Sequence, residues 1–268
     1  MIKDITIGQY FPGNSILHKL DPRMKILLLM SFIITLFIAS SPFSYLFLTL
    51  ITIALMILSG VPLKMYIRGL KPLIIIICIT GFLNMFYSTG EPILEFWIFR
   101  LTIEGILNAI FMITRILMLV IITSMLTYTT SPIVLTNGLE RLLSPLKILK
   151  IPVHEFSMMM TIALRFIPIL LEETDKIMNA QKSRGADFET GNILKRIKSL
   201  IPILIPLFVS AFRRATDLAI AMECRCYGGD SKYRTHLVQY KFAFRDYSSI
   251  FLMAFILTFV ILLNRFTF

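Results

Sequence analysis

Two short stretches of the sequence place an arginine at the same point of a similar phrase: "AQKSRGAD" (180–187) and "AMECRCYG" (221–228). In each stretch the arginine, Arg184 or Arg225, stands four residues after an alanine and closes a long segment whose earlier part is apolar. A guanidinium group presents a planar fork of donors, which pairs with carboxylates through two parallel hydrogen bonds. Two such exposed groups are therefore suited to docking into acidic grooves on a partner.

A simpler interpretation of either arginine alone is a helix end. A cation near a helix C-terminus is favoured by about 0.3–1 kcal/mol through the helix dipole, and glycine is the preferred residue just past the end. This explains Arg184 followed by Gly185. It does not require the same phrase twice, 41 residues apart, at the ends of two long helices.

Other site chemistry has little support in the sequence. No G-x-x-x-x-G-K-[ST], H-E-x-x-H or G-x-S-x-G motif occurs, so we expect neither a nucleotide-binding loop nor an enzyme. The Cys224-Arg225-Cys226 stretch offers two thiol ligands, whereas Zn²⁺ normally takes four. We therefore expect no metal or cofactor in this chain, and we expect the three cysteines to be unpaired.

The composition is that of a membrane protein. Of the 268 residues, 56% are hydrophobic and 16% charged, against about 25% charged in ordinary soluble domains. The net charge of +11 does not indicate nucleic-acid binding, because no face interleaves basic and aromatic residues. Five apolar segments are predicted to span the bilayer: 24–40, 43–59, 72–87, 106–127 and 250–263.

Basic residues set the predicted orientation. With the N-terminus in the cytoplasm, 24 of the 27 Lys and Arg residues fall in the leader, in the loop after the second span, or in 129–246. This is a strong positive-inside pattern, so we expect a multi-pass protein of the cell membrane with a cytoplasmic N-terminus.

The segment 129–246 is predicted to hold three amphipathic helices on the cytoplasmic side, at roughly 131–150, 154–184 and 192–226. The second and third are apolar in one part and charged towards the end, and neither apolar stretch is long enough to cross a bilayer. Pro168, Pro202 and Pro206 should also kink them. We expect these helices to lie at the membrane surface or to slope out of it, with their apolar parts against lipid or protein. The predicted organisation is therefore 1–128 (leader and four spans), 129–246 (coupling helices) and 247–268 (last span).

These segments resemble those of a known family. The leader "GQYFPGNSILHKLDPRMK", the stretch "TTSPIVLTNGLERLLSPLK" and the two arginine-tipped helices are similar to the transmembrane coupling subunit, the T component, of energy-coupling factor (ECF) transporters. The similarity runs from Gly8 to the last span. It implies an all-α polytopic protein with about five spans and three coupling helices.

The resemblance implies partners as well as a fold. In that family two ABC-type ATPases bind ATP and magnesium, a small S component in the membrane binds the substrate, and the T component couples them. The tripeptides that dock on the ATPases correspond to two stretches here: Ser183-Arg184-Gly185 and Cys224-Arg225-Cys226. Cys226 stands where the family has glycine, so a left-handed cap there would be strained, and Gly228 is an alternative helix stop.

Arg115 lies mid-span, where an unpaired charge costs at least about 2.5 kcal/mol, so we expect it to bond Asn84, backbone carbonyls or another subunit. A structural role is favoured over a substrate contact. A permease of a conventional ABC importer also docks on ATPases, but it normally presents one coupling helix per subunit. Neither the transported vitamin or metal ion nor a dedicated or shared role follows from the sequence.

Overall fold

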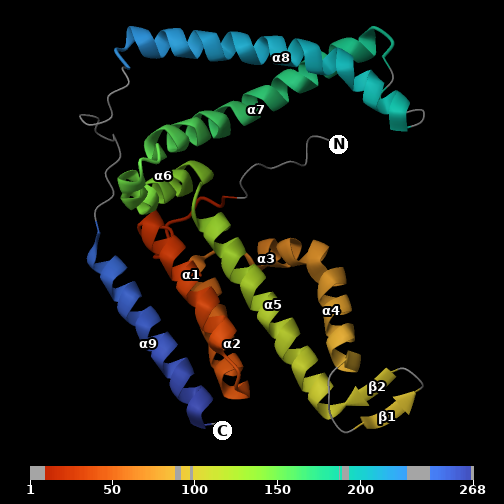
Figure 1. Cartoon of the computed structure of the whole chain (residues 1–268), viewed down its shortest axis with the longest axis vertical. Helices are drawn as coiled ribbons and strands as arrows, with labels where there is room; N and C mark the ends of the chain where they lie inside the picture. The colour runs from red at the N-terminus through yellow and green to blue at the C-terminus, as the bar shows by residue number, and fades with distance from the viewer. Residues whose placement is uncertain are drawn as a thin grey trace. The chain divides into compact units, whose positions relative to one another are not determined.

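The computed structural model describes residues 10–87, 92–96, 99–186, 188, 193–227 and 242–266. The α-helices are α1 (Pro22–Ile38), α2 (Pro42–Ser59), α3 (Leu63–Leu70), α4 (Ile74–Tyr87), α5 (Ile103–Thr129), α6 (Pro132–Leu143), α7 (Val153–Ser183), α8 (Ile193–Cys224) and α9 (Phe244–Phe266) (Figure 1). Two 3-10 turns accompany them, η1 (Lys71–Leu73) and η2 (Ser144–Leu149). The predicted all-α polytopic fold is confirmed.

One small β-ribbon adds to the helices. Strands β1 (Pro92–Phe96) and β2 (Phe99–Thr102) pair antiparallel between α4 and α5. These strands lie between the predicted spans 72–87 and 106–127, where no secondary structure was expected. Within the described part of the chain this ribbon is the one departure from a purely helical fold.

The elements form two compact units, divided between Pro145 and Leu146. The membrane unit holds α1–α6 and α9, and the helical hairpin holds α7 and α8. The predicted coupling segment 129–246 is thus shared between them, because α6 packs on α1 in the membrane unit. Gly138 permits this approach, since a Cβ there would lie 3.0 Å from Pro22 Cβ.

Local capping signals set the ends of the membrane-unit helices. The Asp21 carboxylate accepts a hydrogen bond from the Arg23 N–H at 2.9 Å and begins α1, which has proline at its first position. The Thr102 hydroxyl likewise accepts from the N–H of Gly105 at 3.0 Å and begins α5. Gly60, with φ of 68°, ends α2.

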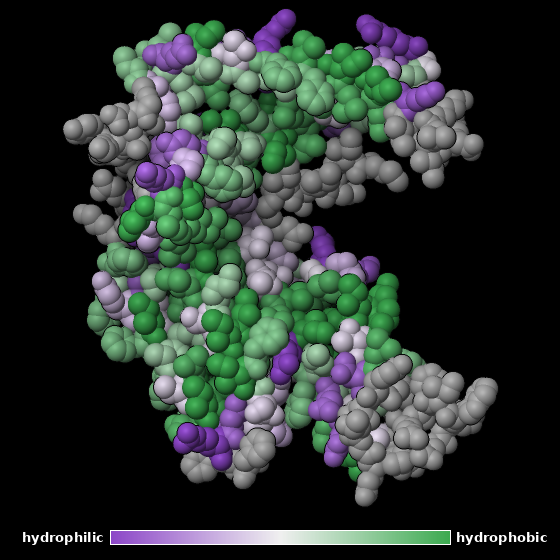
Figure 2. Space-filling view, viewed as in Figure 1, coloured by the Kyte–Doolittle hydropathy of each residue, from purple (hydrophilic) through white to green (hydrophobic). Residues whose placement is uncertain are grey.

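The membrane unit buries a core and leaves much apolar surface outside. Its largest buried cluster draws on α1, α2, α5 and α9 and includes Phe32, Leu36, Leu48, Met118, Ile122 and Val260. Large apolar side chains of α4, including Ile74, Ile75 and Ile79, are more than half exposed. Figure 2 shows apolar side chains on the outer surface of these helices. Such a surface suits a lipid environment, where apolar exposure carries no penalty.

Five described helices are long and apolar enough to cross a membrane, judged by length and composition. They are Pro42–Ser59, Leu63–Met85, Ile103–Thr129, Val153–Ser183 and Phe244–Arg265. Three of them contain the predicted spans 43–59, 106–127 and 250–263, extended into flanking residues as expected, and Leu63–Met85 overlaps most of the predicted span 72–87. The predicted span 24–40 corresponds to α1, which has 17 residues and is too short to be counted among the five. α7, which was not predicted to span, is counted instead.

The result for α7 corrects the expectation that its apolar part is too short to span. An 18-residue window with at most two charged residues is sufficient, and residues 153–170 contain only Glu155 and Arg165. That α7 lies at the membrane surface stays a prediction.

α7 and α8 form an antiparallel pair. Three side-chain contacts join them: Tyr227 with Met158, Arg214 with Glu173, and Gln181 with Pro202. From the first contact to the third, the residue number decreases along α8 and increases along α7. The two helices therefore run side by side in opposite directions over most of their length.

Proline inside α8 explains one of these contacts. Pro206 has no N–H to donate to the carbonyl of Pro202, four residues before it. The side-chain amide of Gln181 donates to that carbonyl at 3.5 Å. A carbonyl left without its helical partner is thus satisfied from the neighbouring helix. Figure 1 shows that α8 is bent, as its internal prolines predict.

Candidate functional site

The first arginine tip is a complete helix cap. Beyond the last residue of α7, the N–H of Gly185 donates to the carbonyl of Lys182, and the N–H of Ala186 donates to that of Gln181, both at 3.0 Å. Gly185 has φ of +87°. These two bonds and the left-handed residue define a Schellman motif, in which Arg184 is the C-cap residue.

The second arginine tip repeats this geometry. Beyond the end of α8, the N–H of Cys226 donates to the carbonyl of Glu223 at 2.8 Å, and the N–H of Tyr227 donates to that of Met222 at 2.9 Å. Cys226 has φ of +57°. Arg225 therefore occupies the same position in the motif as the arginine at the end of α7.

Cys226 itself takes the left-handed conformation. The alternative that Gly228 stops the helix is wrong, because the cap closes two residues earlier, and Gly228 lies outside the described residues. The cysteine Cβ crowds the backbone at positive φ, at a cost of about 1 kcal/mol relative to glycine. The chain accepts this strain and keeps the arginine in register with the helix end.

All six residues of the two predicted tripeptides are exposed: Ser183, Arg184, Gly185, Cys224, Arg225 and Cys226. Neither guanidinium group forms a hydrogen bond or ion pair with a described residue. The side-chain hydroxyl of Ser183 donates to the carbonyl of Asn179 at 3.1 Å, within its own helix. Cys224 and Cys226 are free thiols. The two cations are thus available to a partner, and each sits at the negative end of a helix dipole.

The structure does not bring the two tips together. Because α7 and α8 are antiparallel, Arg184 lies at one end of the helical hairpin and Arg225 at the other. The contact between Tyr227 and Met158 places the second tip beside residues near 160 of α7. The tips are thus separated by roughly 24 residues, or about 36 Å at about 1.5 Å per residue. At that separation, the two arginine tips could each dock on a different partner subunit.

Between the tips, an ion pair joins the two helices. Arg214 Nη2 and Glu173 Oε2 are 3.0 Å apart, with the side chains 39% and 26% exposed. Helical spacing alone would allow Glu173 to pair with Lys176 on the same helix. The structure places its partner on α8, and the sequence holds no local signal for that choice.

In the membrane unit, Arg115 donates a hydrogen bond to a backbone carbonyl, which was one of its three predicted partners. Its Nη2 donates to the carbonyl of Ala39 at 3.3 Å and to the Tyr45 hydroxyl. Its guanidinium carbon also lies 5.5 Å from the ring centroid of Phe37. Asn84 is not a partner, since its amide bonds its own helix. Arg115 therefore places a cation at the C-terminal end of α1.

Lys25 makes the reciprocal contact. From the sequence it is one of the basic residues near the N-terminus that favour a cytoplasmic location, with no signal of burial, yet it is only 8% exposed. Its ammonium donates to the carbonyls of Thr129 (3.0 Å) and His18 (3.2 Å) and to the Thr130 hydroxyl (3.0 Å). All three protons are used, and a cation from α1 sits at the C-terminal end of α5.

The two contacts make α1 and α5 cap one another. The two contacts are separated by the same number of residues on each helix: they lie at positions 25 and 39 on the α1 side and at positions 129 and 115 on the α5 side. Asn264 of α9 completes the α1 end: its Nδ2 donates to the carbonyl of Ile38 at 2.8 Å. Carbonyls without helical partners are thus satisfied by side chains of neighbouring helices.

Comparison with known proteins identifies the family. A family model described as "Cobalt transport protein" (CbiQ) matches residues 13–237. A relative from Ruminiclostridium cellulolyticum is 52% identical over 264 residues, covering 98% of each chain. One from Clostridium kluyveri is 50% identical over 268 residues (99% and 98% covered), and one from Bacillus subtilis is 46% identical over 238 residues (87% and 90% covered).

Each of these three relatives is named "Energy-coupling factor transporter transmembrane protein EcfT". The identity extends over nearly the whole chain, and the apolar helices of the structure agree with a multi-pass membrane protein. The chain therefore belongs to the CbiQ family, as a transmembrane (T) component of energy-coupling factor transporters.

Proposed function

We propose that this chain relays ATP-driven motion from two ABC-type ATPase subunits to a small substrate-binding S component in the membrane. ATP and magnesium are held by the ATPases, and this chain performs no chemistry of its own. The transported substrate is a vitamin or a metal ion; the description of the matching family names cobalt. The substrate site lies on the S component, so no residue of this chain is assigned to it.

The observation that carries the proposal is the identical cap at two distant helix ends. Arg184 and Arg225 occupy the same position of the same motif, and their exposed guanidinium groups bond no described residue. One helix end of this kind is explained by the helix dipole. The strain accepted at Cys226 to repeat the geometry supports docking into two similar grooves.

The proposal includes an orientation. Basic residues favour a cytoplasmic N-terminus, which puts the segment 129–246 on the side where ATP is available. When ATP closes the ATPase pair, the two grooves move together and carry the arginine tips with them. The antiparallel helices α7 and α8 then slide against each other and tip the S component.

The second candidate is the permease of a conventional ABC importer. It would carry one docking helix per chain and form a pore between two copies. Two equivalent tips in one chain favour the single-copy T component, because one molecule then engages both ATPases.

The test is a mild-detergent pull-down from native membranes together with an uptake assay. We expect Arg184→Glu or Arg225→Glu to reduce ATPase recovery and uptake more than tenfold, because each reversal puts a negative charge against an acidic groove. Arg213→Glu is the matched control, since Arg213 is exposed on the body of α8 and bonds no described residue.

Arg→Lys variants separate docking from helix capping. Lysine keeps the cation at the helix end but loses the two-pronged geometry. We expect Arg184→Lys to leave stability unchanged and to weaken ATPase recovery. Unchanged recovery and uptake in both Glu variants would contradict the proposal. Several S components in the parent pull-down would indicate a shared T component, and a single one a dedicated transporter.

A further inference from the structure

The membrane unit contains a large cavity that the coupling role does not use. Its volume is about 620 Å³, within the range of small-molecule sites in proteins. The walls come from α1, α2, α5 and α9 and from the leader residues just before α1. Three lining residues, Ile16, Leu58 and Leu252, are 58, 52 and 57% exposed, so the cavity opens at the surface.

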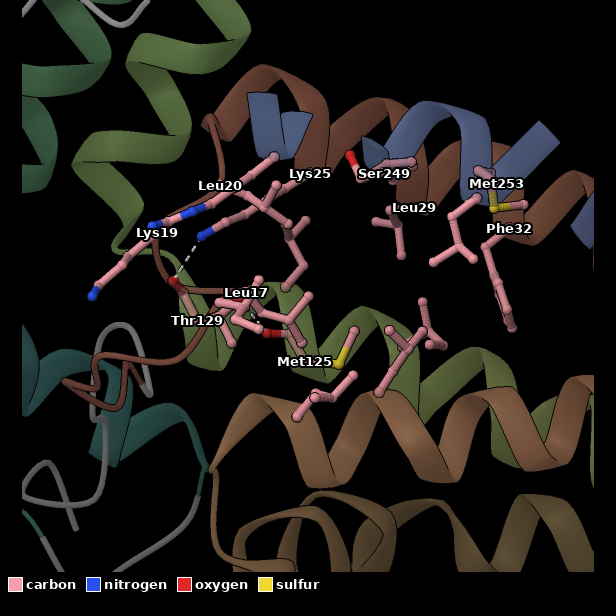
Figure 3. A pocket seen from close by; sticks show the side chains of 18 of the residues that line it. Leu17, Lys19, Leu20, Lys25, Leu29, Phe32, Met125, Thr129, Ser249 and Met253 are labelled. Atoms are coloured by element: carbon pink, nitrogen blue, oxygen red, sulfur yellow. Dashed lines mark hydrogen bonds between the residues drawn. The ribbon is translucent and has the colours of Figure 1, made fainter. Parts of the chain in front are cut away.

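The lining changes character along the helix axes. The polar members come from the leader, the start of α1, the end of α5 and the start of α9: Asn14, Lys19, Lys25, Thr129, Arg245, Ser248 and Ser249. One to two turns further along these helices the wall is apolar, with Leu29, Phe32, Ile122, Met253 and Ile256. Figure 3 shows Lys19, Lys25 and Thr129 at one end and Phe32 and Met253 at the other.

The polar end is cationic and incompletely satisfied. Lys25 spends its three protons on protein oxygens, as its contact with Thr129 in Figure 3 illustrates. The Lys19 and Arg245 side chains are exposed, and neither cationic group bonds a described residue. Of the described residues that line the cavity, none is acidic. This end therefore attracts an anion, and the rest of the cavity attracts hydrocarbon.

An occupant must match both ends. Water is not held in an apolar cavity, because it needs two to four polar partners. An apolar helix of a partner protein would fill the apolar part of the cavity but leave Lys19 and Arg245 without an anionic partner. A molecule with an anionic head and long hydrocarbon chains satisfies both, and the bilayer supplies it.

We propose that this cavity binds one anionic phospholipid. Its phosphate pairs with Lys19 and Arg245, and an acyl chain lies along Leu29 and Phe32 between α1, α5 and α9. The remaining chain leaves through the open side beside Leu252. The site belongs to the membrane unit alone and does not depend on ATPase docking.

Native mass spectrometry of the tagged full chain tests the site. The delipidated protein is titrated with phosphatidylglycerol and with phosphatidylcholine of the same acyl chains. We expect one phosphatidylglycerol to bind at least tenfold more tightly. The double variant Lys19→Gln/Arg245→Gln should lose about thirtyfold in affinity for it, from two removed cations.

Two further variants locate the site. Lys64→Gln/Arg68→Gln removes two exposed cations of α3, which do not line the cavity, and should bind like the parent. Leu29→Trp fills the cavity and should abolish the tight binding, with helicity and thermal midpoint checked first. The glutamine pairs decide the matter if the tryptophan variant does not fold.

Three results would overturn the proposal. Equal binding of the two lipids would mean unspecific annular lipid. Equal loss in both glutamine pairs would mean a diffuse charge effect. A folded Leu29→Trp variant that binds phosphatidylglycerol like the parent would place the lipid elsewhere.

Discussion

The membrane unit and the helical hairpin use the same device, a cation at a helix C-terminus, in opposite ways. In the membrane unit, Lys25 and Arg115 cap the end of a neighbouring helix and bond protein oxygens there. In the hairpin, Arg184 and Arg225 cap their own helices, and their exposed guanidinium groups bond no described residue. The contrast separates cations that hold the fold together from exposed cations that the proposed function assigns to a partner.

The largest stability effect should come from the buried member of this set. Lys25→Met leaves the carbonyls of Thr129 and His18 and the Thr130 hydroxyl without their donor in a buried position. We expect a loss of about 3 kcal/mol in unfolding free energy. Thermal or denaturant unfolding in detergent measures it.

Arg184→Met is the matched variant in the hairpin. It removes an exposed cation with no described partner, so only the dipole interaction is lost, below about 0.5 kcal/mol. Equal losses in the two variants would erase the distinction between structural and docking cations.

Adding a glycine at one helix cap and removing the glycine from the other should change the stability of the chain in opposite directions. Cys226→Gly relieves the positive φ of +57° and should stabilise the chain by about 1 kcal/mol. Gly185→Ala introduces a Cβ at φ of +87° and should cost about as much. Unfolding midpoints of both variants, with both arginines retained, measure these effects. A neutral Cys226→Gly would mean that the second cap carries no strain.

A similarly small effect is expected for the ion pair between α7 and α8. Glu173 and Arg214 are partly exposed, so a double-mutant cycle with Glu173→Gln and Arg214→Gln should give a coupling of about 0.5 kcal/mol. The coupling should shrink as salt is added. A coupling above about 2 kcal/mol, unaffected by salt, would show that the pair is a main support of the hairpin.

The sequence predicts the helices well because apolar runs and proline or glycine stops are local signals. The ends of the three predicted coupling helices fall within a few residues of α6 with η2, α7 and α8. Burial is not local: Lys25 reads as one more leader charge until α5 is placed beside it. The partner of Glu173 is also set by tertiary packing.

The sequence names the residues of the candidate site but does not give the distance between them. The arginine phrases single out Arg184 and Arg225, whereas their separation depends on the antiparallel pairing of α7 and α8. The glycine rule also misled at Cys226, because the cap geometry prevails over the preference of one residue.

Site-specific photo-crosslinking in native membranes tests the central claim most directly. A photoreactive residue replaces Ser183 or Cys224, each next to an arginine that is kept, and Arg213 serves as the control position on the body of α8. The account predicts crosslinks from both tips to ATPase subunits and none from position 213. Absence of ATPase crosslinks at both tips, with the complex still assembled, would contradict it and leave the arginines as helix caps.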